Sequence, residues 1–109
     1  MDISLSSHQG VPVLRVAGDI DMSTAPRFDA ALEERSDGFR SPVLLDLSGC
    51  PFLDSGALNV LLQAVRRLGG SAWLGVVGAN RNLMRIFEIV ALTADPRFRV
   101  FRDLTEVPV

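Results

Sequence analysis

Short apolar runs alternate with segments of helical periodicity along this sequence, and that alternation limits the chain to few folds. The run from Val43 to Leu47 is nearly continuous in apolar residues and too short for a helix, which favours a buried strand. The next segment has apolar residues at i, i+3, i+4, i+7 and i+10, namely Leu58, Leu61, Leu62, Val65 and Leu68. A strand followed by such a helix and another strand implies parallel strands joined by a right-handed crossover.

The same alternation extends over the whole chain. The predicted strands cover residues 3–6, 13–17, 43–47, 72–77 and 98–101, and a helix follows the second, third and fourth of them. A turn at residues 8–10 makes the first two strands an antiparallel hairpin. The order ββαβαβαβ predicts an α/β fold: a mixed β-sheet with the helices packed mainly on one face. With 109 residues, the chain is long enough for a single domain over 1–109.

Each predicted helix has a capping residue before it. Ser23 or Thr24 precedes the first helix, which contains Pro26 and ends at Asp37-Gly38. Asp54 and Asn80 precede the second and third helices. Gly69-Gly70 predicts a left-handed end to the second helix.

The supply of reactive side chains argues against an enzyme. The chain has eleven arginines and no lysine, which excludes the P-loop, Schiff-base chemistry and Ser-x-x-Lys hydrolases. A single histidine, His8, and a single cysteine, Cys50, provide no zinc-ligand cluster. His8 lies in the predicted hairpin turn, and Cys50 is expected to be a small packed residue. We therefore predict neither catalysis nor a cofactor.

Charge and hydropathy argue against nucleic acid and membrane partners. The net charge is −2, and the arginines are dispersed among acidic residues instead of forming a basic stripe. The start of the chain resembles no signal peptide, and no apolar stretch approaches the roughly 20 residues that span a bilayer. We expect a cytoplasmic protein without membrane insertion, present as a monomer or weak dimer.

Four acidic residues, Asp19, Asp21, Asp46 and Asp54, fall at or just beyond predicted strand ends. Such ends can converge in a parallel sheet, which leaves a weak magnesium site open beside the simpler interpretation of caps and turn formers. The segment Asp54-Ser55 has a second interpretation besides a helix cap, namely a phosphorylation site at Ser55. A serine at a helix amino terminus lies among free amides, where a phosphate is tolerated.

Three segments together resemble the STAS domain, in particular the small stand-alone anti-sigma factor antagonists of bacteria. Residues 18–26 resemble the family's Gly-acid-Leu/Ile-Asp turn before a helix capped by Thr-Ala. Residues 43–48 followed by 52–55 resemble its central strand and the loop to its switch helix. Residues 82–87 and 98–101 resemble its third helix and last strand.

The resemblance implies a partner and a regulatory site. Members of the family bind an anti-sigma factor that is also a serine kinase with a histidine-kinase-like ATPase fold, and phosphorylation at the start of the switch helix ends that binding. The acceptor is usually the second residue after the aspartate, which is Gly56 here when Asp54 and Leu58 are matched without a gap. Ser55 is then the remaining candidate phosphorylation site.

Two functions stay open from the sequence. The first is an anti-sigma factor antagonist without the usual phosphorylation switch, and the second is a STAS adaptor in another assembly, such as a lipid-transport ABC system. In the first case, the predicted partner-binding residues are Asp19, Asp21, Asp54, Ser55, Gly56, Asn59 and Gln63.

Overall fold

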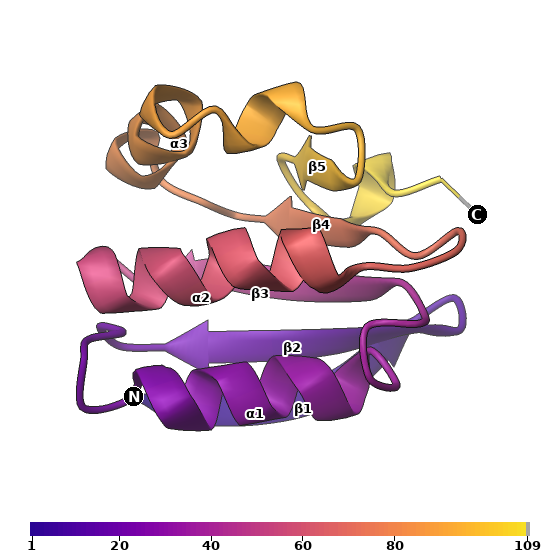
Figure 1. The fold of residues 1–109 in the computed structure, drawn as a ribbon, viewed down its shortest axis with the longest axis horizontal. Helices are drawn as coiled ribbons and strands as arrows, with labels where there is room; N and C mark the ends of the chain where they lie inside the picture. Colours follow the sequence, from indigo (N-terminus) through magenta and orange to yellow (C-terminus); the bar gives the residue numbers. More distant parts are fainter. Residues whose placement is uncertain (109) are drawn as a thin grey trace.

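A computed structural model describes residues 1–108, which form a five-stranded sheet with helices against one face (Figure 1). The strands are β1 (Asp2–His8), β2 (Val11–Ala17), β3 (Val43–Gly49), β4 (Leu74–Val77) and β5 (Phe98–Phe101). The helices are α1 (Ala25–Arg35), α2 (Ser55–Arg67) and α3 (Arg81–Ile89), and the 3-10 helices are η1 (Leu92–Ala94) and η2 (Leu104–Glu106). The predicted order ββαβαβαβ is confirmed.

The spatial order of the strands equals their order in the chain, β1-β2-β3-β4-β5. β1 and β2 pair antiparallel, whereas β2–β3, β3–β4 and β4–β5 pair parallel. Each crossover therefore advances in the same direction across the sheet. Because such crossovers are right-handed, they place their helices on the same face, as the sequence predicted.

The main core lies between that face and the helices. Side chains alternate along β3, so Val43, Leu45 and Leu47 face the helices and are fully buried. α2 contributes its own buried residues to this core, namely Ala57, Leu61, Ala64 and Val65. The helical spacing predicted that Leu58 and Leu62 are buried too, but both are only half-buried. The side of α2 that faces the sheet includes Ala57 and Ala64 instead.

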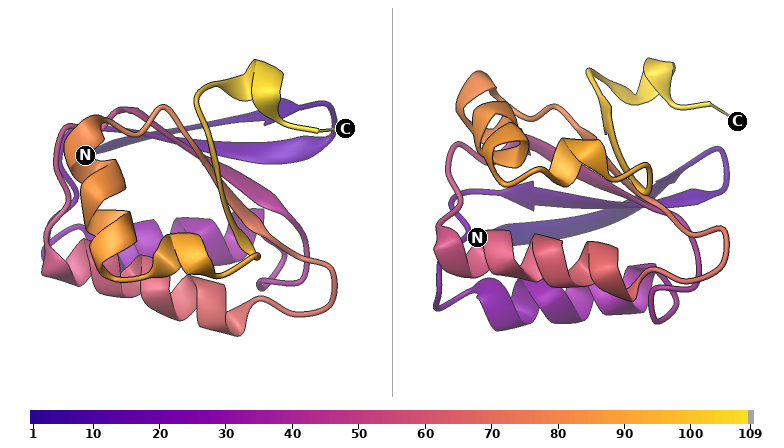
Figure 2. Two further views of the ribbon diagram at one scale, coloured as in Figure 1. Left: turned by 90° about the horizontal axis from the view of Figure 1, so that it is seen from above. Right: turned by 45° about the horizontal axis from the view of Figure 1, so that its top comes forward.

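A second, smaller cluster covers part of the opposite face. It consists of Val13, Leu44, Val77 and Val107, and the last of these follows η2, which crosses that face (Figure 2). Trp73 packs here too, with its ring edge-on to Phe101 at 6.3 Å between ring centroids. Helices therefore cover one face, as predicted, and the end of the chain covers part of the other.

Several predicted boundaries differ from the structure. The first strand extends over Asp2–His8, so that His8 lies in the strand and not in the turn, while the second begins at Val11 and the third ends at Gly49. β4 begins at Leu74 instead of residue 72, because the Ala72 amide donates to the Gly69 carbonyl in a turn. Thr24 is the residue preceding α1, as predicted, but its hydroxyl does not cap the helix. Asp54 and Asn80 cap α2 and α3 as predicted, each accepting a hydrogen bond from an amide of the first helical turn.

Candidate functional site

Two loops beyond the carboxyl ends of β2 and β3 run side by side, and we call residues 18–24 and 50–54 the paired loops. The Gly18 amide donates to the Gly49 carbonyl at 2.8 Å, the Ile20 amide to Phe52 at 3.1 Å, and the Asp54 amide back to Ile20 at 3.0 Å. Ile20 and Leu53 form a parallel bridge and are both buried. The pairing of β2 with β3 thus continues past the strand ends and brings the acidic residues of both loops together.

Asp54 uses both carboxylate oxygens in this arrangement. Its Oδ1 accepts from the Ala57 amide at 3.0 Å, which caps α2. Its Oδ2 accepts from the Met22 amide at 2.9 Å, across to the other loop. A single side chain therefore fixes the start of α2 and holds the first loop against it.

Asp21 organises the first loop. Its Oδ1 accepts from the Ser23 amide at 2.9 Å, the Ser23 hydroxyl at 2.6 Å and the Thr24 amide at 3.1 Å. The hydrogen bond from the Ser23 hydroxyl is the largest cause that holds the pKa of Asp21 below its usual value. The carboxylate thus remains ionised on an exposed surface.

The predicted site residues of α2 lie on its exposed side. Ser55 is the first residue of the helix and is exposed, as are Asn59 and Gln63 one and two turns further on. Gly56 is half-buried beneath the first loop, and a Cβ there would lie 3.2 Å from both the Met22 Cγ and the Asp54 Oδ1. The start of α2 and the first loop therefore pack closely at Gly56, and the exposed residues of α2 continue from that point along one side of the helix.

Sequence reasoning missed two apolar residues on this surface. Met22 is 72% exposed and Phe52 is 52% exposed, one on each paired loop. The signal was available as apolar residues inside polar turns: Met22 follows Asp21, and Phe52 follows Pro51. Large exposed apolar side chains within a polar surface are typical of contact sites between proteins.

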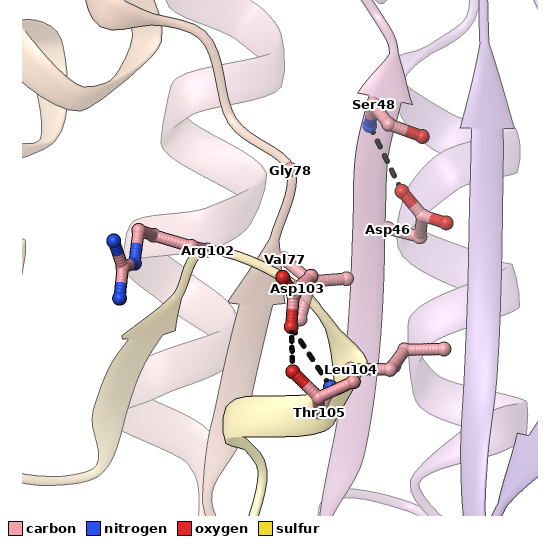
Figure 3. A pocket seen from close by; sticks show the side chains of 8 residues that line it. All are labelled: Asp46, Ser48, Val77, Gly78, Arg102, Asp103, Leu104 and Thr105. Atoms are coloured by element: carbon pink, nitrogen blue, oxygen red, sulfur yellow. Dashed lines mark hydrogen bonds between the residues drawn. The ribbon is translucent and has the colours of Figure 1, made fainter.

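Asp46 does not join the other acids. Its side chain leaves β3 on the face away from the helices, accepts from the Ser48 amide at 2.9 Å, and lies 3.9 Å from Arg15. There it lines an open cavity of about 480 Å³ together with Asp103 and Thr105 (Figure 3). Among residues 1–108, no group of three or more His, Cys, Asp or Glu side chains is placed to hold a metal ion.

The remaining reactive side chains lie apart from this surface or inside it. His8 pairs with Val11 at the hairpin end of the sheet, whereas α2 begins beyond the opposite end. Cys50 is buried, as expected, and its thiol donates to the Phe52 carbonyl at 3.3 Å. Burial, with a smaller contribution from the Asp19 carboxylate, raises the pKa of that thiol. In the described part of the chain, no helix is both long and apolar enough to cross a membrane.

Three features together define a class of small α/β domains. They are a mixed sheet with an antiparallel hairpin at one edge, helices on one face of that sheet, and a capped helix start held against a loop. A family model described as "Mlab, STAS domain" matches residues 3–101. The chain therefore belongs to the STAS domain family, as its sequence motifs indicated.

Relatives of the chain include anti-sigma factor antagonists. The anti-sigma-F factor antagonist RsfB of Mycobacterium tuberculosis is 31% identical over 102 residues, which are 94% of this chain and 82% of that protein. The crystal structure of an anti-sigma factor antagonist from Mycobacterium paratuberculosis superimposes with a TM-score of 0.83 at 28% identity, covering 96% of this chain and 88% of that one. Unphosphorylated SpoIIAA, also an anti-sigma factor antagonist, has a TM-score of 0.71 at 14% identity over 94% and 89% of the two chains, which shows a common fold.

Proposed function

We propose that this chain is an anti-sigma factor antagonist: a non-catalytic protein that binds an anti-sigma factor with a histidine-kinase-like serine kinase fold. The observation that carries the proposal is the 31% identity to an anti-sigma-F factor antagonist over 94% of the chain. Capture of the anti-sigma factor would release its sigma factor for transcription. Binding is the whole activity in this proposal, in accord with a chain that has one histidine and no lysine.

The binding surface in this proposal consists of the paired loops and the exposed side of α2. It includes the predicted residues Asp19, Asp21, Asp54, Ser55, Gly56, Asn59 and Gln63, together with the apolar side chains of Met22 and Phe52. Its carboxylates favour a partner that presents arginine or lysine, through charge-assisted hydrogen bonds. Its two exposed apolar side chains, Met22 and Phe52, provide apolar surface that would be buried against the partner.

The direct test is affinity capture from the native host, followed by titration of the captured partner against variants. Asp19 suits this test best, because its side chain is exposed and its carboxylate makes no hydrogen bond within residues 1–108, so we expect Asp19→Arg to preserve the loop structure. We expect Asp19→Arg to weaken binding about tenfold, and Glu34→Arg, at the other end of α1, to leave it unchanged. Recovery of permease and ATPase subunits of a transporter instead of an anti-sigma factor would replace this proposal with the adaptor function.

We also propose that this chain is a poor substrate for the partner kinase, so that its abundance or the state of its partner, and not its phosphorylation, controls its activity. Gly56 occupies the family's acceptor position and has no hydroxyl. Its close contact with Met22 and Asp54 favours glycine there. Ser55 is exposed, but adjacent helical residues are rotated by about 100°, so a kinase pocket built for the next position meets its hydroxyl at the wrong angle.

Intact mass after incubation with the partner kinase and ATP tests the phosphorylation proposal. We expect little phosphate on the wild-type chain or on Ser55→Ala. Rapid stoichiometric phosphorylation of the wild type that Ser55→Ala abolishes would overturn the proposal and assign the switch to Ser55. Gly56→Ser restores the family's hydroxyl and serves as the comparison, with its fold checked by circular dichroism because of the close contacts at that position.

A further inference from the structure

The free edge of β1 has the hydrogen-bonding pattern and the side chains to pair with itself. We propose that two copies of this chain associate antiparallel along β1, with Leu5 opposite Leu5 of the second copy. β1 is one of the two edge strands of the sheet, the other being β5, and β2 lies on its inner side. The association would join two five-stranded sheets into one.

The hairpin turn determines which groups of β1 are free. Gln9 and Gly10 both have positive φ, 51° and 85°, and they form a two-residue turn between His8 and Val11. In such a turn the flanking residues exchange both backbone hydrogen bonds, and the pattern alternates from there. His8, Ser6, Ser4 and Asp2 therefore bond to β2, while Ile3, Leu5 and Ser7 direct their amides and carbonyls outward.

Within residues 1–108, β1 has none of the features that usually prevent pairing at a sheet edge. β1 contains no proline and no lysine and pairs with β2 in unbroken register, so the usual obstacles to edge pairing are missing from it. α1 packs against α2 and β2 and leaves Leu5 57% exposed. The Arg35 guanidinium donates a hydrogen bond to the Ser6 carbonyl, but that carbonyl points toward β2 and not toward the free edge. Within residues 1–108, the outward amides and carbonyls of Ile3, Leu5 and Ser7 make no hydrogen bond.

One register satisfies all of these outward groups at once. Centred on Leu5, it pairs Ile3 with Ser7 of the second copy and Leu5 with its own equivalent, so each outward residue meets another outward residue. The same register places Asp2 opposite His8 of the second copy, twice across the two-fold axis. A carboxylate facing an imidazole is favourable for either protonation state of the imidazole, because each form has an N–H to donate. This complementarity is why we assign the edge to a second copy.

Cysteine cross-linking tests both the association and its register. Opposite residues in this register have Cα atoms about 5.5 Å apart, within the range of a disulfide, so Leu5→Cys should form a covalent dimer under mild oxidation. Ser7→Cys is the matched control: its two copies would be four residues apart, about 13 Å, and should stay unlinked. Native Cys50 is buried and does not compete.

Sedimentation of the untagged chain between about 10 μM and 1 mM measures the unmodified association, which is expected to be weak because one strand edge is a small interface. Leu5→Lys should abolish it by placing like charges opposite each other, whereas Ile89→Lys on exposed α3 should not. Asp2→His and His8→Asp should each weaken it, and the double variant should restore it. A monomer at every concentration, or equal cross-linking of Leu5→Cys and Ser7→Cys, would overturn the proposal.

Discussion

At the scale of single residues, the surface beyond β2 and β3 depends on two aspartates that satisfy backbone amides. Asp54 accepts amides of Met22 and Ala57, and Asp21 accepts amides of Ser23 and Thr24. Both are acids that the sequence assigned to partner contact. In the structure both carboxylates hold the loops in place through hydrogen bonds from backbone amides. Variants at these positions are therefore expected to change folding as well as the proposed binding.

Replacing Asp54 should lower the free energy of unfolding in graded steps. Asp54→Ala removes the helix cap and the bond to Met22, and we expect a loss of about 2 kcal/mol. Asp54→Asn retains one acceptor oxygen, so one of the two bonds survives and the loss should be about half as large. Urea unfolding measures both. The neighbouring exposed Ser55→Ala should change the stability by less than about 0.5 kcal/mol, and an equal loss there would contradict the assignment.

The pKa of Asp21 should depend on Ser23 more than on Thr24. The Ser23 hydroxyl is the largest cause of the lowered pKa, and the Thr24 side chain is the smallest. We expect Ser23→Ala to raise the pKa toward the ordinary 3.8, and Thr24→Ala to raise it less. Carboxyl NMR titration measures this directly, and a larger rise in Thr24→Ala would reverse the assignment.

The same lowered pKa has a consequence for stability against acid. Because the unfolded chain binds the proton more readily, the ionised Asp21 stabilises the fold above about pH 3.8, and this stabilisation is lost as pH falls through the lowered value. Asp21→Asn should therefore flatten the decline in unfolding free energy as pH falls below about 3.8, which urea unfolding at a series of pH values measures.

At the scale of elements, local patterns in the sequence predicted all five strands and three helices of the fold. Alternation and helical spacing determine which face of an element is buried, and capping residues mark where α2 and α3 begin. Contacts between distant segments escaped that reasoning. The bond from the Met22 amide to Asp54 joins residues 32 positions apart, and only the pairing of the two loops creates it. Asp46 was grouped with the strand-end acids, but β3 continues to Gly49, so its side chain alternates to the other face.

β4 contains a glycine whose missing side chain makes room for the second cluster. A Cβ on Gly75 would lie 2.8 Å from side-chain atoms of both Leu44 and Trp73, and 3.0 Å from Phe101. These three neighbours pack together in the second cluster and have little room to move. We therefore expect Gly75→Ala to lower the unfolding free energy by about 1–3 kcal/mol. Gly69→Ala, where a Cβ meets nothing within 4 Å, is the matched control and should be near neutral. Thermal and urea unfolding of the pair would show whether space at Gly75, and not glycine replacement itself, is responsible.

At the scale of the whole molecule, exposed large apolar side chains occur in separate places. Leu5 lies on edge strand β1, Val100 on edge strand β5, Ile89 on α3, and Met22 and Phe52 on the paired loops. The paired loops are hydrogen-bonded to each other and carry three aspartates, so Met22 and Phe52 stand on neighbouring segments among carboxylates. An apolar centre inside a polar rim is the usual anatomy of a protein interface, in which a few large side chains carry most of the affinity. The edge of β1 and the paired loops are thus two different kinds of surface, one built from backbone groups and the other from side chains.

If the paired loops bind the anti-sigma factor, Phe52 should be one of the side chains that carry the affinity. Phe52→Ala removes a half-exposed ring from a loop whose backbone bonds to Ile20 remain, so the fold should survive. We expect its dissociation constant for the captured partner to rise at least about tenfold in calorimetry, mainly through faster dissociation. Ile89→Ala removes a more exposed apolar side chain from α3 and should leave the constant unchanged. Equal weakening by both variants would mean that binding follows general apolar exposure, and weakening by Ile89→Ala alone would move the partner from the paired loops to α3.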